Sequence, residues 1–298
     1  MKTSKTLAFI LLLAAFNSFN MFAQDKIKFS NKFRLTSFYL FTGISTQQNR
    51  IATLEEFQSL APNSQILKGD YTDFTEMTGK SRSGNSLFSV AVGLKLTPNN
   101  KPVNTSLRLG FNYFSSITVF GGVYKEYRSA YDTLTSSQTG QTYYMDSISS
   151  KSVSMQYLSE QLHFDGSLIF CTNSEERWSL FTGIGFTAGL SINANTNIYY
   201  YQYDRVESYN SGNGYYGADS GSSIDYKSDF MKNKNVKGYS VYVPFGVDFR
   251  IGKKREFWKR THLYYEFRPC LSVTMVPELT TFSTTKFQQG LGLRVNWK

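Results

Sequence analysis

Hydrophobic and polar side chains alternate through the last fifth of the chain. Between residues 237 and 251 the apolar positions are Tyr239, Val241, Val243, Phe245, Val247, Phe249 and Ile251, and most positions between them are small or polar. The runs 261–276 and 285–297 repeat this alternation after short turns. A period of two is the pattern of β-strands that have one apolar and one polar face. The segment therefore predicts three consecutive strands, and the open question is which solvent each face meets.

The same pattern predicts eight strands along the whole chain. They fall near residues 33–43, 86–97, 105–121, 151–171, 177–203, 238–252, 261–276 and 285–297. The connections 44–85, 122–150, 204–237 and 277–284 are long or variable, whereas 98–104, 172–176 and 253–260 are short. This alternation is typical of outer-membrane barrels, which have short periplasmic turns and longer external loops. An alternative count of ten strands would use residues 64–75 and part of the following loop.

The N-terminal residues predict export from the cytoplasm. Lys2 and Lys5 precede an apolar run from Leu7 to Phe16, and Ala23 offers a small residue for cleavage. Such a run is shorter than the ~20 residues that span a bilayer, so residues 1–23 are expected to be a cleaved signal peptide. Residues 24–298 would then form one β domain.

The chain ends on a strand with a recognisable signature. Gln288, Gly290, Leu293 and Val295 follow a polar-x-Gly-x-x-apolar-x-apolar pattern, and Trp297 is a late aromatic residue. In these features and in its strand pattern the chain resembles the small bacterial outer-membrane β-barrels of the OmpA/OmpX type. The resemblance implies an all-β, antiparallel, up-and-down transmembrane barrel in the bacterial outer membrane. It also implies that the barrel-insertion machinery reads the ending, from which Lys298 departs because a terminal aromatic is usual.

The net charge of +10 is unevenly distributed. The N-terminal segment, the short turns and the C-terminus hold eleven basic residues against Asp25, Glu175, Glu176 and Glu256; the basic ones are Lys26, Lys28, Lys32, Lys101, Arg177, Lys253, Lys254, Arg255, Lys259, Arg260 and Lys298. Basic residues near an anionic lipid surface contribute about 1 kcal/mol each. We therefore expect a basic collar that contacts membrane lipids, with wall polymers as a further partner, and no nucleic acid.

Charges also fall on the polar face of the predicted strands. In a barrel of about eight strands the interior is only wide enough for side chains to fill it. Buried charges there must pair, because an isolated one is costly. We therefore predict a structural polar network in the barrel interior, with room provided by Gly183, Gly185 and Gly189; its members are Arg108, Asp165, Asp248, Arg250, Glu266, Arg268 and Arg294.

Few residues of the chain have the spacing that catalysis or cofactor binding requires. His163, Asp165 and Ser167 share one strand face, but residues two apart on a strand lie about 6–7 Å apart, too far for a nucleophile–base hydrogen bond. Asp219, Asp225 and Asp229 lack the spacing of a calcium loop. Cys171 and Cys270 fall on strands that are not neighbours, so two free thiols are expected. No catalytic, metal or cofactor site is predicted.

Two segments outside the predicted membrane region have structure of their own. Thr53 and Glu56 form a capping box before Leu54, Phe57 and Leu60, which predicts a short helix that covers the mouth, lies against the rim or packs its own loop. The strand 177–203 is longer than the ~9–11 residues that cross a bilayer, so hairpins should rise above the membrane and carry Tyr199, Tyr200, Tyr201 and Tyr203.

These features predict a non-enzymatic envelope protein with surface-exposed loops. The loops 44–85, 122–150 and 204–237 would contact an extracellular or envelope partner. The alternatives are a narrow porin, an accessory barrel of a secretion or assembly system and, least favoured, a lipid-modifying enzyme. Fold alone does not choose among them.

Overall fold

A computed structural model describes residues 34–79, 81–96, 104–172, 176–210, 214–216 and 223–297. The predicted signal peptide at 1–23 lies outside these residues. The chain forms β1 (Arg34–Gln48), β2 (Arg50–Ile51), α2 (Leu54–Leu60), η1 (Ile66–Lys68), β3 (Thr75–Glu76), β4 (Arg82–Lys95), β5 (Asn104–Thr135), β6 (Thr142–Cys171), β7 (Trp178–Asn210), β8 (Gly214–Tyr216), β9 (Ser223–Lys232), β10 (Lys237–Tyr242), β11 (Phe245–Arg250), α3 (Glu256–Arg260), β12 (Thr261–Met275) and β13 (Phe282–Asn296). Among the described residues, no helix has the length and hydropathy needed to cross a bilayer.

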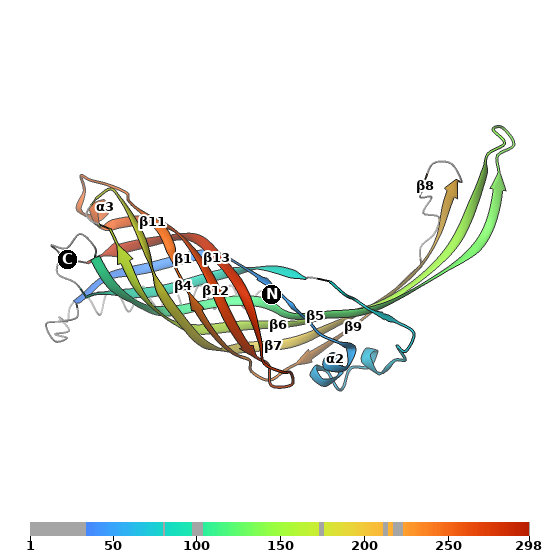
Figure 1. Ribbon diagram of the computed structural model, residues 1–298, viewed down its shortest axis with the longest axis horizontal. Helices are drawn as coiled ribbons and strands as arrows, with labels where there is room; N and C mark the ends of the chain where they lie inside the picture. The colour runs from blue at the N-terminus through green and yellow to red at the C-terminus, as the bar shows by residue number, and fades with distance from the viewer. Residues whose placement is uncertain are drawn as a thin grey trace.

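Every long strand has an antiparallel neighbour on both sides. From β1 the ladders run through β4, β5 and β6 to β7. β10 and β11 both pair with β7 and with β12, and β13 pairs with β12 and with β1. These pairings give the protein a β-barrel architecture (Figure 1).

The predicted strand 238–252 is divided in two. β10 ends at Tyr242 and β11 begins at Phe245, with Val243 and Pro244 between them. Proline has no amide hydrogen to donate to a ladder, which explains the interruption. Because both halves pair with the same two strands, they occupy one position in the barrel.

The two faces of the barrel strands differ in chemistry. The buried face carries many polar and charged residues, among them Arg108, Asn112, Gln161, Asp165, Thr187, Asp248, His262, Glu266, Arg268 and Arg294. The exposed face is apolar and includes Leu180, Ile184, Phe186, Val241, Phe245, Leu263, Tyr265, Leu271, Phe287 and Leu291. The alternation predicted from the sequence is thus confirmed, with its apolar side turned outward.

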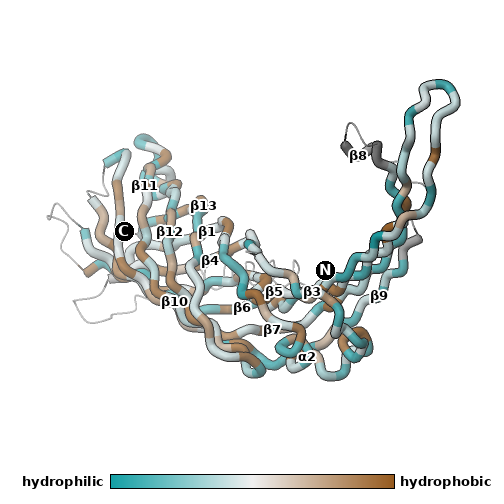
Figure 2. The backbone as a smooth tube through the Cα atoms, turned by 45° about the vertical axis from the view of Figure 1, so that its right-hand side comes forward, coloured by the Kyte–Doolittle hydropathy of each residue, from teal (hydrophilic) through white to brown (hydrophobic). Residues whose placement is uncertain are grey.

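Three strands continue far beyond the barrel as an arm. The β5–β6 ladder extends to the Thr135–Thr142 pair, β7 follows β6 to Asn210, and β9 pairs along the outer edge of β7. The predicted links 122–150 and 204–237 are therefore largely strand, so these boundaries were wrong, although tall hairpins are present. β-Bulges near Thr118 on β5 and Ile192 on β7 mark the base of the arm, and bulges bend and twist strands. The arm bends away from the barrel and is mostly hydrophilic (Figures 1 and 2).

The long first loop holds the predicted helix. In α2 the Thr53 side chain accepts a hydrogen bond from the Glu56 amide, and the Glu56 side chain accepts one from the Thr53 amide, so the predicted capping box is confirmed. Residues 64–75 form η1 and turns, and a ladder begins there only at Thr75. They do not supply the strand pair that a ten-strand count requires.

Candidate functional site

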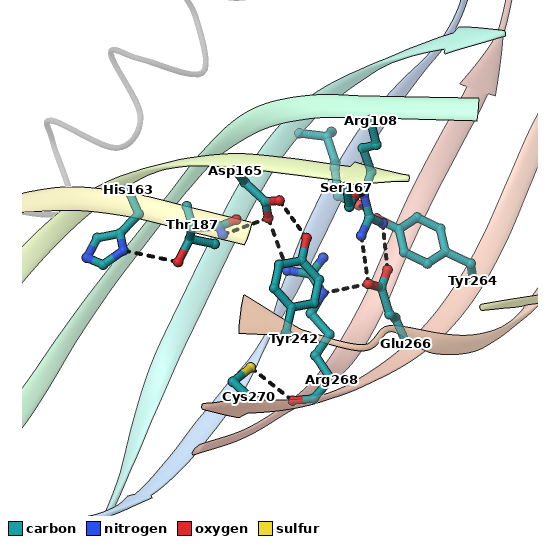
Figure 3. Close-up of polar contacts among 12 residues, drawn as sticks. Arg108, His163, Asp165, Ser167, Thr187, Tyr242, Tyr264, Glu266, Arg268 and Cys270 are labelled. Carbon is teal, nitrogen blue, oxygen red and sulfur yellow. Dashed lines mark hydrogen bonds and ion pairs between the residues drawn. The ribbon is translucent and has the colours of Figure 1, made fainter. Parts of the chain in front are cut away.

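The barrel interior is held by one central charged cluster (Figure 3). Glu266 on β12 accepts two hydrogen bonds from the Arg108 guanidinium on β5, at 2.7 and 2.8 Å, and a third from Arg268 Nε at 2.6 Å. Arg268 Nη1 lies 3.6 Å from Asp165 Oδ2 on β6. Glu266 and Arg268 are 0% and 1% exposed. The cluster therefore ties three strands together around charges that have almost no contact with solvent.

Neutral side chains complete this cluster. Tyr242 on β10 donates to Asp165 Oδ1 at 2.5 Å, and Asn112 donates to Asp165 Oδ2 at 2.8 Å. Ser167 accepts from Arg108 Nε at 3.0 Å. The approach of Tyr242 depends on Gly185, because a Cβ at that position would overlap the tyrosine ring. The interior is closely packed at this level.

Aromatic rings also line the interior. Tyr39, Phe41 and Tyr264 belong to a buried cluster with Leu87, Ala91 and Phe114. The Arg268 guanidinium lies 4.5 Å from the Phe41 ring centre, and that of Arg108 lies 5.7 Å from Tyr39. A cation within about 6 Å of an aromatic face is attracted to it. The arginines are thus held by carboxylates and by rings together.

A second charged cluster lies nearer the end with the short turns. Asp248 Oδ1 on β11 is 2.6 Å from His262 Nδ1 on β12 and 3.2 Å from Arg294 Nη2 on β13. Asn296 Nδ2 lies 3.3 Å from His262 Nε2. Six of the seven residues named from the sequence therefore lie in two clusters. Arg250 joins neither, since no ion pair of its guanidinium is found among the described residues.

Several interior residues were not predicted. Tyr242 and Tyr264 were missed because their positions follow the polar parity although their side chains are aromatic. Lys286, buried on β13 with its Nζ 5.3 Å from the Phe114 ring centre, was also missed. Its parity with Arg294 on the same strand was the signal that could have identified it.

The His163–Asp165–Ser167 set is not joined by hydrogen bonds in the described part of the chain. The His163 ring nitrogens lie 2.9 Å from Gln161 Oε1 and 3.4 Å from Thr187 Oγ1. Asp165 and Ser167 are instead engaged in the central cluster. Cys171 and Cys270 are free thiols, as predicted, and both are buried.

The mouth of the barrel is covered by an apolar cap. Phe57 and Leu60 of α2 and Leu67 of η1 pack against β5, β6 and β7 through Val119, Val123, Val153, Met155, Tyr157 and Ile198. The same core includes Val236 and Val276, beside β10 and β12, and touches Phe282 at the start of β13. Side chains of β5, β6 and β7, of the links next to β10 and β12, and of β13 therefore meet here, so the helix packs across this end of the barrel and not only within its own loop.

Polar contacts fix the cap to the base of the arm. Asp229 on β9 accepts hydrogen bonds from Ser64 Oγ at 2.5 Å and from the Ile66 amide at 3.2 Å. Asn233 donates to the Leu60 carbonyl at 2.7 Å. Burial, with a smaller contribution from nearby Tyr200, raises the pKa of the Tyr71 hydroxyl above its ordinary value. The cap is packed and tethered over the barrel.

Comparisons with known proteins give no family. Models of known protein families do not match the chain, and curated protein sequences do not match it either. Among solved structures, Neisserial surface protein A is similar at 11% identity, with 87% of this chain and 97% of that chain covered and a TM-score of 0.35. The attachment invasion locus protein of Yersinia pestis, solved with a heparin analogue, gives 8% identity, coverage of 88% and 99%, and a TM-score of 0.23. TM-scores this low do not establish a shared fold.

The class of protein is therefore defined by its own geometry. It is a β-barrel with an apolar outer wall, an interior filled by charged and aromatic side chains, and a cap over one end.

Proposed function

We propose that the chain is an integral outer-membrane barrel of eight strands, with β10 and β11 counted as one, that anchors an external arm and does not conduct. The apolar wall supports the membrane part of this proposal. Soluble monomers rarely expose apolar patches beyond a few hundred Å², whereas a transmembrane barrel turns such a band to lipid. The signal peptide at 1–23 and the ending from Gln288 to Trp297 are expected to direct export and insertion.

The filled interior carries the rest of the proposal. A porin needs a continuous water path, but the central cluster and the cap stand one behind the other along the barrel. Buried ion pairs of this kind hold side chains in place rather than form a path. We therefore favour a structural and display role over a pore, a secretion accessory or an enzyme.

Reconstitution tests this proposal. Purified protein should insert into phosphatidylcholine vesicles and give no steady single-channel current in planar bilayers. A large, stable conductance from the wild-type protein would contradict the closed interior. Protein that stays monodisperse in detergent-free buffer would contradict the membrane assignment altogether.

We further propose that the arm binds a partner through one of its two sheet faces. Tyr199, Tyr201 and Tyr226 share this face, with ring centres 6.4 Å apart for Tyr199–Tyr226 and 5.1 Å for Tyr201–Tyr226. On β6, Ser152 pairs with Tyr201 and Ser154 pairs with Tyr199, so both serines lie on the same face. Tyrosine beside serine is the composition of the antigen-binding loops of antibodies, because tyrosine gives rigid contact area and serine gives adaptable hydrogen bonds.

Adjacent residues on β9 provide a matched test of this face. Tyr226 is 51% exposed on the tyrosine face, and Lys227 is a well-exposed residue on the other, with its Nζ 5.5 Å from the Tyr200 ring centre. A photo-crosslinking amino acid at position 226 should give defined adducts on intact cells, and one at 227 should give far fewer. Equal labelling from both positions would argue against a binding face.

A further inference from the structure

The rim opposite the arm is built around the segment that joins β11 to β12. α3 and the C-terminus lie at this end (Figure 1). The Gly252 amide donates to the Trp258 carbonyl at 3.1 Å, Ile251 donates to the Thr261 carbonyl at 3.0 Å, and Thr261 Oγ1 donates to the Phe257 carbonyl at 2.9 Å. Gly252 allows close packing, because a Cβ there would lie 2.5 Å from that of Trp258. The segment is therefore fixed on the rim.

Exposed aromatic side chains gather on this rim. Phe257 and Trp258 are 61% and 42% exposed and lie edge to face, with ring centres 5.1 Å apart. Trp178, 62% exposed, lies 4.5 Å from Phe249 between ring centres. Trp297 follows β13 at the same end, so all three tryptophans of the sequence are placed here. Tryptophan favours the boundary between hydrocarbon and water, where one part of the ring is apolar and the other wet.

Positive charge surrounds these rings. Residues 252–260 contain Lys253, Lys254, Arg255, Lys259 and Arg260 against the single acid Glu256. Glu256 contacts Lys259 at 2.9 Å and Arg260 at 3.5 Å. Lys253, Lys254 and Arg255 are exposed and form no ion pair within the described ranges. Three cations thus remain available beside two exposed rings.

We propose that this rim binds the headgroups of anionic phospholipids in the periplasmic leaflet, an inference that rests on the proposed membrane location. Lys253, Lys254 and Arg255 can form ion pairs with phosphate oxygens. Phe257 and Trp258 can lie at the boundary with the acyl chains, where the apolar wall of the barrel begins. A soluble acidic polymer would satisfy the charges but leave Phe257 and Trp258 in water. Amphipathic segments that combine basic and aromatic residues bind membrane interfaces in this way.

The test compares lipid preference among barrels that are already inserted. Wild-type protein in phosphatidylcholine vesicles is titrated with phosphatidylglycerol, and bound lipid is counted by native mass spectrometry. Trp258 is followed by quenching with brominated lipid in a W178F/W297F background, in which it is the only tryptophan. The variant K253Q/K254Q/R255Q should lose up to about a hundredfold of the preference for phosphatidylglycerol, from ~1 kcal/mol per basic residue. Raised salt should weaken the wild-type preference in the same direction.

Control variants separate this site from charge in general. K227Q/K232Q/K234Q removes three lysines from β9 and the link that follows it and should leave the preference unchanged. F257S/W258S should lower the number of bound lipids counted by native mass spectrometry at low phosphatidylglycerol. If the wild-type protein inserts but shows no preference for phosphatidylglycerol, the lipid-binding inference is wrong while the membrane assignment stands. Equal loss in the arm control, or sedimentation with purified cell-wall sacculi instead of lipid, would overturn it as well. Failure to insert at all would overturn the membrane assignment first.

Discussion

Replacing Glu266 with Gln should lower the free energy of unfolding of the barrel by about 3–5 kcal/mol, the cost of leaving buried charges without their partner. Glu266 is the only carboxylate that contacts both Arg108 and Arg268 among the described residues. Its loss leaves two buried guanidiniums with Asp165 alone, 3.6 Å from Arg268. Urea titration in detergent micelles, followed by circular dichroism and by gel migration of unheated samples, measures the change.

Glu160 supplies the matched control for this change. It lies on β6 at the parity opposite to Gln161 and Asp165, so Glu160→Gln removes a carboxylate outside the interior. The free energy of unfolding of that variant should lie within about 0.5 kcal/mol of the wild-type value. If E266Q does not fold, R108M/E266M/R268M provides the second measurement, since apolar residues in place of a buried ion triad are often neutral. In that variant Asp165 keeps its hydrogen bonds from Tyr242 and Asn112. An E266Q barrel as stable as wild type would contradict the central cluster as a source of stability.

Replacing Phe57 with Ala should release the cap without unfolding the barrel. Phe57 is fully buried in the core over the mouth, and truncation of a buried phenylalanine costs about 3–5 kcal/mol. Residues 52–76 meet the rest of the molecule mainly through this core, so the loss should appear as local opening. Amide hydrogen exchange should rise by two orders of magnitude or more in 52–76 and stay constant in β12 and β13.

Phe230→Ala is the control for the cap, because Phe230 is an exposed phenylalanine on β9 of the arm. Exchange in the cap should not respond to it. Unchanged cap exchange in F57A would show that the cap is held elsewhere, for example by Asp229 and Asn233. Because E266Q acts on the barrel and F57A on the cap, the two variants should alter different sets of amides.

Period-two alternation was enough to locate the barrel strands but not their ends. A ladder can continue through polar sequence when both strands are long, so β5 and β6 run on past residues 121 and 151 although their hydrophobic pattern fades. The division between β10 and β11 was signalled by Pro244, which the pattern alone ignores. The capping box at Thr53 and Glu56 predicted α2 correctly because its chemistry is local.

The alternation in the sequence is sufficient to show which face of each strand is apolar and to assign most of the interior charges to the other face, because side-chain direction alternates along any strand. Which charges meet depends on the folded barrel. Glu266 contacts Arg108 across 158 residues of chain, and Arg250 is left out of both clusters although its parity is the same as that of Asp248. Register and barrel curvature select these partners, and neither is encoded in a strand taken alone. The same holds for the cap, whose core joins α2 and η1 to β5, β6, β7 and the links at Val236 and Val276, which no local pattern connects.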